Sequence, residues 1–307
     1  MSTDALPKQV VVVVNVHSRR GQKAFEDSCS KLKAAGVEVL AEHAVDDPDE
    51  MRPIVREAIA NKAPMIIIGG GDGSLSTVVD DFLGHDTVFA VLPLGTANSF
   101  ARTLGLPLDL DGAIDVIAHG RKKRIDLGSI DGDYFANAAA MGMSPLIAES
   151  VPSKLKRYLG MLGYLIWAIR VAFKFRPFRL HVYEGDRVHR MWATEARIAN
   201  GSFHGGVELV ENAELTSGRI VVQAVTGRSL WGLAWSWFAT LFKLRGREQT
   251  VSEFHAPELR IVARPPQKIS IDGELLAETP VVVRVARAAI LVAAPRPEQM
   301  ADSTQAS

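Results

Sequence analysis

The segment from Met65 to Phe82, MIIIGGGDGSLSTVVDDF, joins a run of branched apolar residues to three consecutive glycines and a lone aspartate. The apolar run is as short as a buried parallel strand, and Val78, Val79 and Phe82 then recur at helical spacing. The glycines therefore form a loop between a strand and a helix. In α/β proteins such a loop commonly holds a phosphate group on its backbone N–H groups.

The glycine spacing excludes two familiar phosphate loops. A dinucleotide fingerprint needs a third glycine where this chain has Ser74, and a P-loop needs a lysine that does not follow Gly73. Without that lysine, Asp72 could help to neutralise a triphosphate only by holding a Mg²⁺ ion against it. The alternative reading of the loop is a tight turn with Ser74 as a helix N-cap.

The first 125 or so residues alternate between strand and helix patterns. The expected strands cover 9–16, 37–45, 64–68 and 88–95, and the expected helices cover 22–35, 47–61, the segment after Ser74, and 99–105. This alternation predicts a doubly wound parallel sheet, whose ligands bind beyond the carboxyl ends of the strands. Three loops follow strands in this way: NVHSRRG from Asn15, GGGDGS from Gly69 and PLGTANS from Pro93.

After about Ile125 the pattern changes to strands separated by turns. The segment 178–192 predicts a hairpin with Gly185 in its turn, and further strands are expected at 195–201, 218–225, 258–263, 268–274 and 281–295. We therefore predict a nucleotide-binding α/β domain over 1–125 and a mostly antiparallel β-sandwich domain over 126–295, with the active site in the cleft between them. A polar tail over 296–307 would be loose or pack back on the first domain.

Composition narrows the class of protein. Acidic and basic residues balance at 35 each, so no strong overall field favours nucleic acid. The single cysteine, Cys29, indicates a reducing cytoplasm, and the first residues lack the pattern of a signal peptide. No clean run of twenty apolar residues is present, so we do not expect an integral membrane protein.

Two segments carry a signal for lipid surfaces. The residues 229–247 combine Trp231, Trp235 and Trp237 with a basic end, which suits either a membrane interface or a helix packed on the sandwich. We favour the membrane slightly. The basic run RKKR at 121–124 could contact anionic headgroups, but we favour a solvated helix end.

Four motifs, in order along the chain, resemble one family. They are GGDGS at 70–74, PLGTAN at 93–98 followed by Phe100 and Ala101, RIDLGSIDGDYFANAAAMG at 124–142, and Asp272-Gly273-Glu274. Together they resemble the diacylglycerol kinase catalytic-domain family, especially the soluble bacterial lipid kinases. The first motif alone is shared with NAD kinases and phosphofructokinases, whereas the set of four is specific.

The resemblance implies an ATP-dependent lipid kinase that uses Mg²⁺ and reaches its lipid at the membrane surface. It implies that Glu274 accepts the proton of the lipid hydroxyl with Asp272 beside it, although the residues alone favour an Asp-Gly turn with two solvated acids. Asp72 would hold the metal through Mg-ATP. The implied nucleotide-binding residues are Asn15, Ser18, Gly70, Gly71, Asp72, Gly73, Ser74, Leu75, Ser76, Gly95, Thr96 and Asn98.

The chain departs from the family in its first loop. The family pattern Asn-Pro-x-Ser-Gly reads here as Asn15-Val16-His17-Ser18-Arg19, without the proline and the glycine. A threonine expected near the end of the second strand is replaced by Ala44 or Val45, which puts one hydroxyl contact to ATP in doubt.

A second departure concerns metal. Ser217 and Ser99 stand where the better known bacterial members have two acids around a structural Mg²⁺. Because hydroxyls replace carboxylates poorly around a hard cation, we predict no structural metal in the second domain. Glu211 and Glu214 are close in sequence and are the residues that could restore such a site.

Two other functions remain open from the sequence. One is a kinase for a soluble substrate, of the NAD kinase type, which the aromatic segment and the PLGTAN motif disfavour. The other is a nucleotide- or lipid-binding protein without turnover, which the retained Asp72, Asp272 and Glu274 disfavour.

Overall fold

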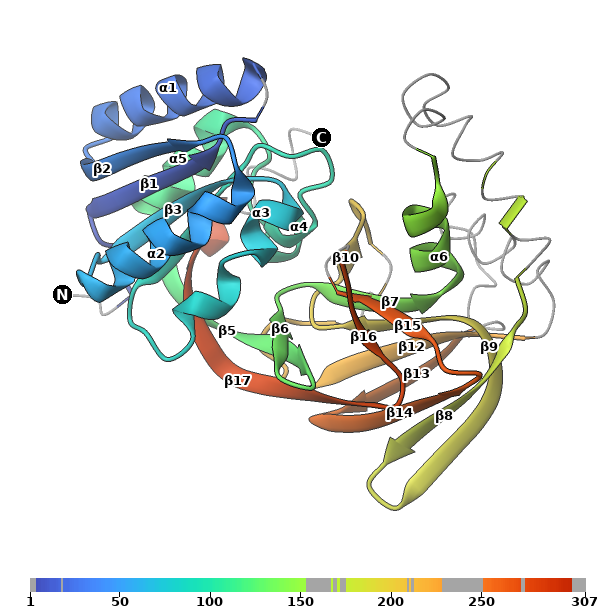
Figure 1. Ribbon diagram of the computed structural model, residues 1–307. Helices are drawn as coiled ribbons and strands as arrows, with labels where there is room; N and C mark the ends of the chain where they lie inside the picture. Colours follow the sequence, from blue (N-terminus) through green and yellow to red (C-terminus); the bar gives the residue numbers. More distant parts are fainter. Residues whose placement is uncertain are drawn as a thin grey trace.

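The computed structural model describes residues 4–17, 19–152, 167, 170–171, 175–208, 210, 213–227, 251–271 and 274–299. Its first part is the predicted parallel α/β domain (Figure 1). The sheet has the order β2-β1-β3-β4-β17, with neighbouring strands parallel. The elements of this part are β1 (Gln9–Asn15), α1 (Arg19–Ala34), β2 (Glu38–Val45), η1 (Pro48–Glu50), α2 (Met51–Ala60), β3 (Met65–Gly70), α3 (Asp72–Ser76), η2 (Val79–Phe82), β4 (Val88–Pro93), α4 (Ser99–Leu104) and α5 (Leu110–His119).

The valine run of β1 explains why helices cover both faces of this sheet. Successive side chains of a strand point to opposite faces. Val10, Val12 and Val14 belong to a core cluster with residues of α1 and α5, whereas Val11 and Val13 belong to a cluster with residues of α2 and η2. A strand buried on both faces reads as an unbroken apolar run, which is what the sequence has.

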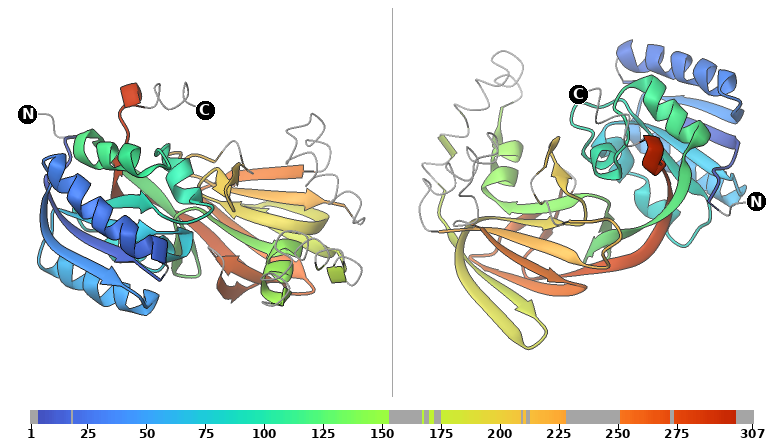
Figure 2. Two further views of the ribbon diagram at one scale, coloured as in Figure 1. Left: turned by 90° about the horizontal axis from the view of Figure 1, so that it is seen from above. Right: turned by 180° about the vertical axis from the view of Figure 1, so that it is seen from behind.

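The second part is a mostly antiparallel β domain, as predicted (Figure 2). Apolar side chains from its strands form a separate core cluster that includes Phe178, Ile198, Val222 and Ile261. Its elements are β5 (Arg121–Ile130), β6 (Asp133–Phe135), β7 (Ala138–Gly142), α6 (Met143–Ser150), β8 (Phe178–Glu184), β9 (Arg187–Ala199), β10 (Phe203–His204), β11 (Val207–Glu208), β12 (Ile220–Thr226), β13 (Val251–Ala256), β14 (Glu258–Arg264), β15 (Lys268–Ile271), β16 (Glu274–Glu278) and β17 (Val281–Ala294).

The predicted hairpin is confirmed. Glu184 pairs with Arg187 across a turn that contains Gly185 at φ +56°, a backbone conformation that glycine adopts readily. The strand predicted at 195–201 is present as far as Ala199, but it is not a separate strand, because β9 continues into it from the hairpin without a break. No glycine or proline lies between Trp192 and Glu195 to end the strand.

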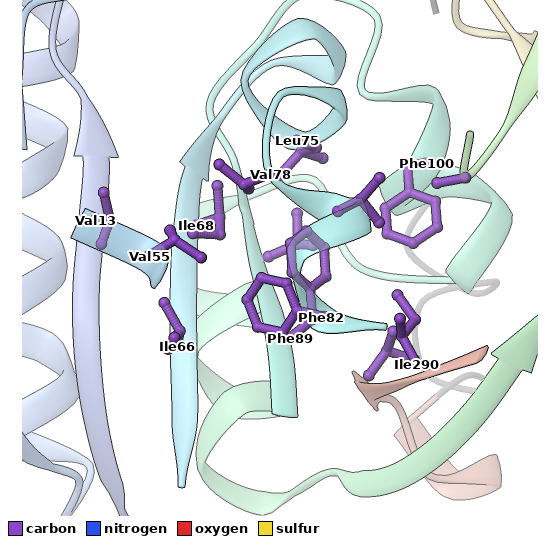
Figure 3. Packing of buried hydrophobic residues seen from close by; sticks show 14 of the residues in the cluster. Val13, Val55, Ile66, Ile68, Leu75, Val78, Phe82, Phe89, Phe100 and Ile290 are labelled. Atoms are coloured by element: carbon purple, nitrogen blue, oxygen red, sulfur yellow. The ribbon is translucent and has the colours of Figure 1, made fainter. Parts of the chain in front are cut away.

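The last strand, β17, joins the two parts. Its first residues pair with β14 in the second domain, and Leu291 and Val292 pair in parallel with β4 of the first domain. Figure 3 shows Ile290 near Phe82 and Phe89, which meet edge to face with ring centroids 4.8 Å apart. Residues 281–294 therefore belong to both cores.

Three local predictions need correction. The run at 121–124 is not a helix end: it begins β5, which pairs with 291–294 of β17 after Gly120 has ended α5. Burial lowers the pKa of Lys123 in this strand, and Arg121 lowers it further.

Two helices also differ from the prediction. Helix α1 begins at Arg19 and not at Gln22. Helix α5 was not predicted, although Asp109 caps it by accepting a hydrogen bond from the Gly112 amide.

Most of the two helix-like segments at 154–175 and 229–244, including the aromatic residues from Trp231, lies outside the described residues. Among the residues that are described, none belongs to a helix with the length and apolar character needed to cross a bilayer. The start of the polar tail contacts the first domain, since Gln299 donates a hydrogen bond to Asp115 of α5 at 2.7 Å.

Candidate functional site

The three loops singled out in the sequence meet at the carboxyl edge of the parallel sheet. The Asn15 amide donates to the hydroxyl of Ser74 at 3.1 Å, which ties the end of β1 to the loop after β3. The Asn98 side chain accepts from the Gly95 amide at 2.9 Å and donates to the Gly95 carbonyl at 2.9 Å. These amides fix the shapes of the loops that follow β1, β3 and β4.

Two close approaches leave room only for glycine, one between the loops after β3 and β4 and one within the loop after β3. A Cβ atom on Gly95 would lie 2.4 Å from the Cα of Gly71, and one on Gly70 would lie 2.6 Å from the hydroxyl of Ser74. Such separations are far below van der Waals contact. Steric packing therefore accounts for these motif glycines independently of any ligand.

A cavity of about 290 Å³ opens where the loops meet. It is lined by Asn15, His17, Gly21, Ala24, Gly70, Gly71, Ser74 and Leu94. Its volume is near the lower end of the range for small-molecule sites, roughly 300 Å³ and above. Of the lining residues only His17 is ionisable, so backbone, amide and hydroxyl groups provide most of the polar surface. This surface fits a phosphate group whose charge is neutralised from elsewhere.

The carboxylate of Asp72 points to helix α4. Its two oxygens accept hydrogen bonds from the backbone amides of Ser99 and Phe100, each at 3.0 Å. These are the first amides of α4, which have no partner within the helix. Asp72 therefore joins the loop after β3 to the start of α4.

The remaining predicted nucleotide-binding residues differ in their surroundings. Leu75 is buried in the core cluster with Val78, so its side chain packs away from the cavity. Gly73 and Thr96 are exposed, and Ser76 is partly exposed at the end of α3. Ser18 lies outside the described residues.

Of the two predicted catalytic acids, Glu274 is the first residue of β16. Asp272 is outside the described residues, and of Glu274 the structure describes the backbone, which pairs with Ile271. Ile271 pairs in turn with Ala139 of β7. The start of β16 is therefore joined through Ile271 to the end of β7 that begins with Ala138.

Four residues that line the cavity were not predicted from the sequence: His17, Gly21, Ala24 and Leu94. A Cβ atom on Gly21 would lie 2.8 Å from the Cα of Val16, so this glycine permits the close return of α1 to the end of β1. Its position shortly after the altered Asn-Pro-x-Ser-Gly pattern was the available signal.

The turn at Ser217 and Gly218 is held by other groups. Asp126 accepts a hydrogen bond from the Gly218 amide at 2.7 Å and one from the Ala288 amide at 2.7 Å. The guanidinium of Arg287 donates to the Gly218 carbonyl at 3.3 Å. A cationic side chain therefore lies at the turn where the family resemblance implied a structural metal.

Comparisons with known proteins agree along nearly the whole chain. Residues 9–130 match the family model described as the diacylglycerol kinase catalytic domain. Residues 137–294 match the model described as the YegS C-terminal NAD kinase beta sandwich-like domain. The second match begins where the alternating α/β pattern has ended.

Curated relatives named diacylglycerol kinase are similar over most of their length. That of Staphylococcus epidermidis is 27% identical over 262 residues, covering 84% of this chain and 83% of the relative. That of Staphylococcus aureus is 30% identical over 220 residues, covering 69% and 68%. A solved structure titled as a diacylglycerol kinase from Bacillus anthracis superposes with a TM-score of 0.74 at 20% identity, covering 97% of this chain and 99% of the other.

Proposed function

Because the chain belongs to the diacylglycerol kinase catalytic-domain family, we propose that it is an ATP-dependent lipid kinase. It transfers the γ-phosphoryl group of ATP to a hydroxyl of a diacylglycerol-like or sphingoid lipid. The observation that carries the proposal is the cavity at the carboxyl edge of the sheet, because the GGDGS motif supplies three of the residues that line it. We place the enzyme in the cytoplasm, with its lipid at the membrane surface.

In this proposal the loops position the nucleotide. The backbone of Gly70 to Gly73 and the side chains of Asn15, Ser18, Ser74 and Ser76 bind the phosphates. Thr96, beside Gly95 and Asn98, contacts the nucleotide. Phosphoryl transfer asks a protein chiefly to hold donor and acceptor in line and to spread charge. A cavity lined by glycine backbone, an amide and a hydroxyl suits the first requirement, and Mg²⁺ associated with Asp72 would meet the second.

Glu274 is the proposed proton acceptor, with Asp272 beside it. The lipid oxygen forms a bond to the γ-phosphorus, the bond to the bridging oxygen of ADP breaks, and the hydroxyl proton passes to the Glu274 carboxylate. A positioned base of this kind contributes roughly a hundredfold or more to rate. Support comes from the position of β16, which begins with Glu274. It pairs with β15, and β15 pairs with β7. Asn137, the residue before β7, is hydrogen-bonded to Thr103 of α4.

The test is a transfer assay with γ-labelled ATP in mixed micelles, against a panel of diacylglycerols, sphingoid bases and NAD. We expect label in one or more lipids and none in NAD. Label in NAD alone would assign the chain to soluble-substrate kinases. Tight ATP binding without transfer to any acceptor would indicate a binding protein without turnover.

A further inference from the structure

Helix α4 of the first domain connects the loop after β3 to the second domain. On one side, its first backbone amides bind the carboxylate of Asp72 in the loop after β3. On the other side, the Ser99 hydroxyl accepts a hydrogen bond from the Gly206 amide at 2.9 Å. One turn further along, the Thr103 hydroxyl lies 2.9 Å from the side-chain oxygen of Asn137 and 3.0 Å from the Ser99 carbonyl, the two acceptors within reach of its single proton. Two hydroxyls on one face of this short helix therefore hold the second domain.

The receiving groups in the second domain are themselves well fixed. Asn137 is only 5% exposed, its carbonyl accepts from the amides of Asn200 and Gly201 at 2.9 Å each, and its side-chain amide donates to the Phe203 carbonyl. The Phe203 amide lies 3.4 Å from the Thr103 hydroxyl. Hydrogen bonds within the second domain therefore connect the ends of β7, β9 and β10, independently of their contacts with α4.

The packing leaves little freedom at this junction. A Cβ atom on Gly201 would lie 2.3 Å from the Asn137 side-chain oxygen and 2.8 Å from a Thr103 methyl group. Gly206 has φ +81°, and a Cβ atom there would lie 3.3 Å from Ala97, just before α4. Close packing of this kind transmits a displacement of one side to the other.

The junction lies between the two parts of the proposed active site. Asp72 belongs to the loop beside the cavity, and β7, which follows Asn137, pairs with the hairpin that carries Glu274. Transfer between bound reactants depends steeply on their separation, and a misplacement of about 1 Å can cost roughly a hundredfold in rate.

We propose that Ser99 and Thr103 are positioning residues, whose hydroxyls form a latch between α4 and the second domain and set the place of Glu274 relative to the nucleotide loops. The rate consequence rests on the proposed function, whereas the latch itself does not. Ser99 thus takes a role in this chain that needs a hydroxyl and no metal, since its direct partner is a backbone amide.

The test compares Ser99→Ala and Thr103→Val with the conservative variants Ser99→Thr and Thr103→Ser, and with Ser129→Ala as a control. Ser129 carries a strand hydroxyl whose contact, with the Arg284 carbonyl, stays within the second domain. We expect the first two variants to lower kcat about tenfold or more, with KM for ATP within about twofold of the parent. The conservative variants should recover most of kcat, and the control should match the parent.

A second measurement does not need activity. Hydrogen exchange at the Gly206 amide should become about tenfold faster in Ser99→Ala and stay slow in Ser99→Thr and in the control. If the parent protein shows no lipid kinase activity but Ser99→Ala still exchanges faster at Gly206 than the parent does, the result supports the latch and refutes the proposed function. Unchanged exchange and unchanged kcat in both Ser99→Ala and Thr103→Val would overturn the latch.

Discussion

At the scale of single residues, Asp72 has a structural task that its motif does not reveal. An asparagine there keeps one acceptor oxygen but turns an N–H₂ group toward the second amide of α4. We expect Asp72→Asn to lower the free energy of unfolding by about 1.5–3 kcal/mol, the range for hydrogen bonds to a charged group, and to weaken the use of Mg-ATP. Thermal or denaturant unfolding and the KM for Mg-ATP measure the two effects.

The control for this variant is Asp86→Asn. The Asp86 side chain is 91% exposed and pairs with Arg124 on the surface, so its loss should change stability by less than about 1 kcal/mol. Equal effects of the two variants would show that the contacts of Asp72 with α4 are unimportant for stability.

Glu274 provides the corresponding catalytic prediction. Glu274→Gln keeps the size of the side chain and removes the proton acceptor, so turnover should fall by roughly a hundredfold or more. Nucleotide affinity, measured by calorimetry, should stay nearly unchanged because the proposed base does not hold ATP. A variant with nearly full turnover would mean that another group takes the proton.

Metal is a further prediction at this scale. With Ser217 and Ser99 in place of two acids, and with Arg287 bonded to Gly218, we expect no structural Mg²⁺ in the second domain. Elemental analysis of nucleotide-free protein should find no tightly bound equivalent, and a chelator should leave the melting temperature unchanged. One retained equivalent whose removal lowers the melting temperature would contradict this.

At the scale of elements, β17 has an irregularity that can be tested directly: its register with β5 shifts between Ala286 and Ile290. Ala288 has φ +46°, a left-handed conformation that costs a residue with a Cβ atom about 1–2 kcal/mol. Its amide is bonded to Asp126, which holds it in place. We expect Ala288→Gly to raise the free energy of unfolding by about 0.5–1 kcal/mol.

The matched control is Ala286→Gly, two residues earlier in the same strand. Ala286 pairs regularly with Leu127, so glycine should lower stability there by about 0.5–1 kcal/mol. Chemical denaturation of both variants gives the comparison. The same sign of change for both would argue against strain at Ala288.

The elements also show what the sequence can and cannot reveal. The unbroken apolar runs of β1 and β3 and the turn at Gly185 have local causes, so both domains and the β8–β9 hairpin were predictable. The pairing of 121–124 with β17 has no local cause, because the two segments are far apart in the chain. The charged residues therefore read as a solvated helix end.

The same limit applies to the candidate site. Asn15, Gly70, Gly71 and Ser74 were placed together because strands of a parallel sheet end at one edge. His17 and Gly21 lie in the loop after β1, which was expected beside the ligand, but its pattern departs from the family, and the resemblance therefore singled out only Asn15 and Ser18 there. The direction of the Asp72 side chain depends on the position of α4, which a reading of local patterns cannot provide.

At the scale of the whole molecule, the sharing of β17 predicts how the protein unfolds. Its residues contribute to the cores of both domains, including Ile290 in the first and Val283 in the second. Loss of either domain therefore exposes apolar surface of the other. We expect one cooperative thermal transition, with calorimetric and van't Hoff enthalpies equal within error. Two separated transitions would show that the domains are energetically independent.

The position of β17 in the chain also matters during synthesis. Chains leave the ribosome N-terminal end first, and domains generally fold as they emerge. Here the edge of β4 receives Leu291 and Val292 only after the entire second domain has been made. During synthesis the first domain therefore has an unpaired apolar strand edge until β17 has been made. An exposed edge of this kind promotes aggregation unless a chaperone covers it.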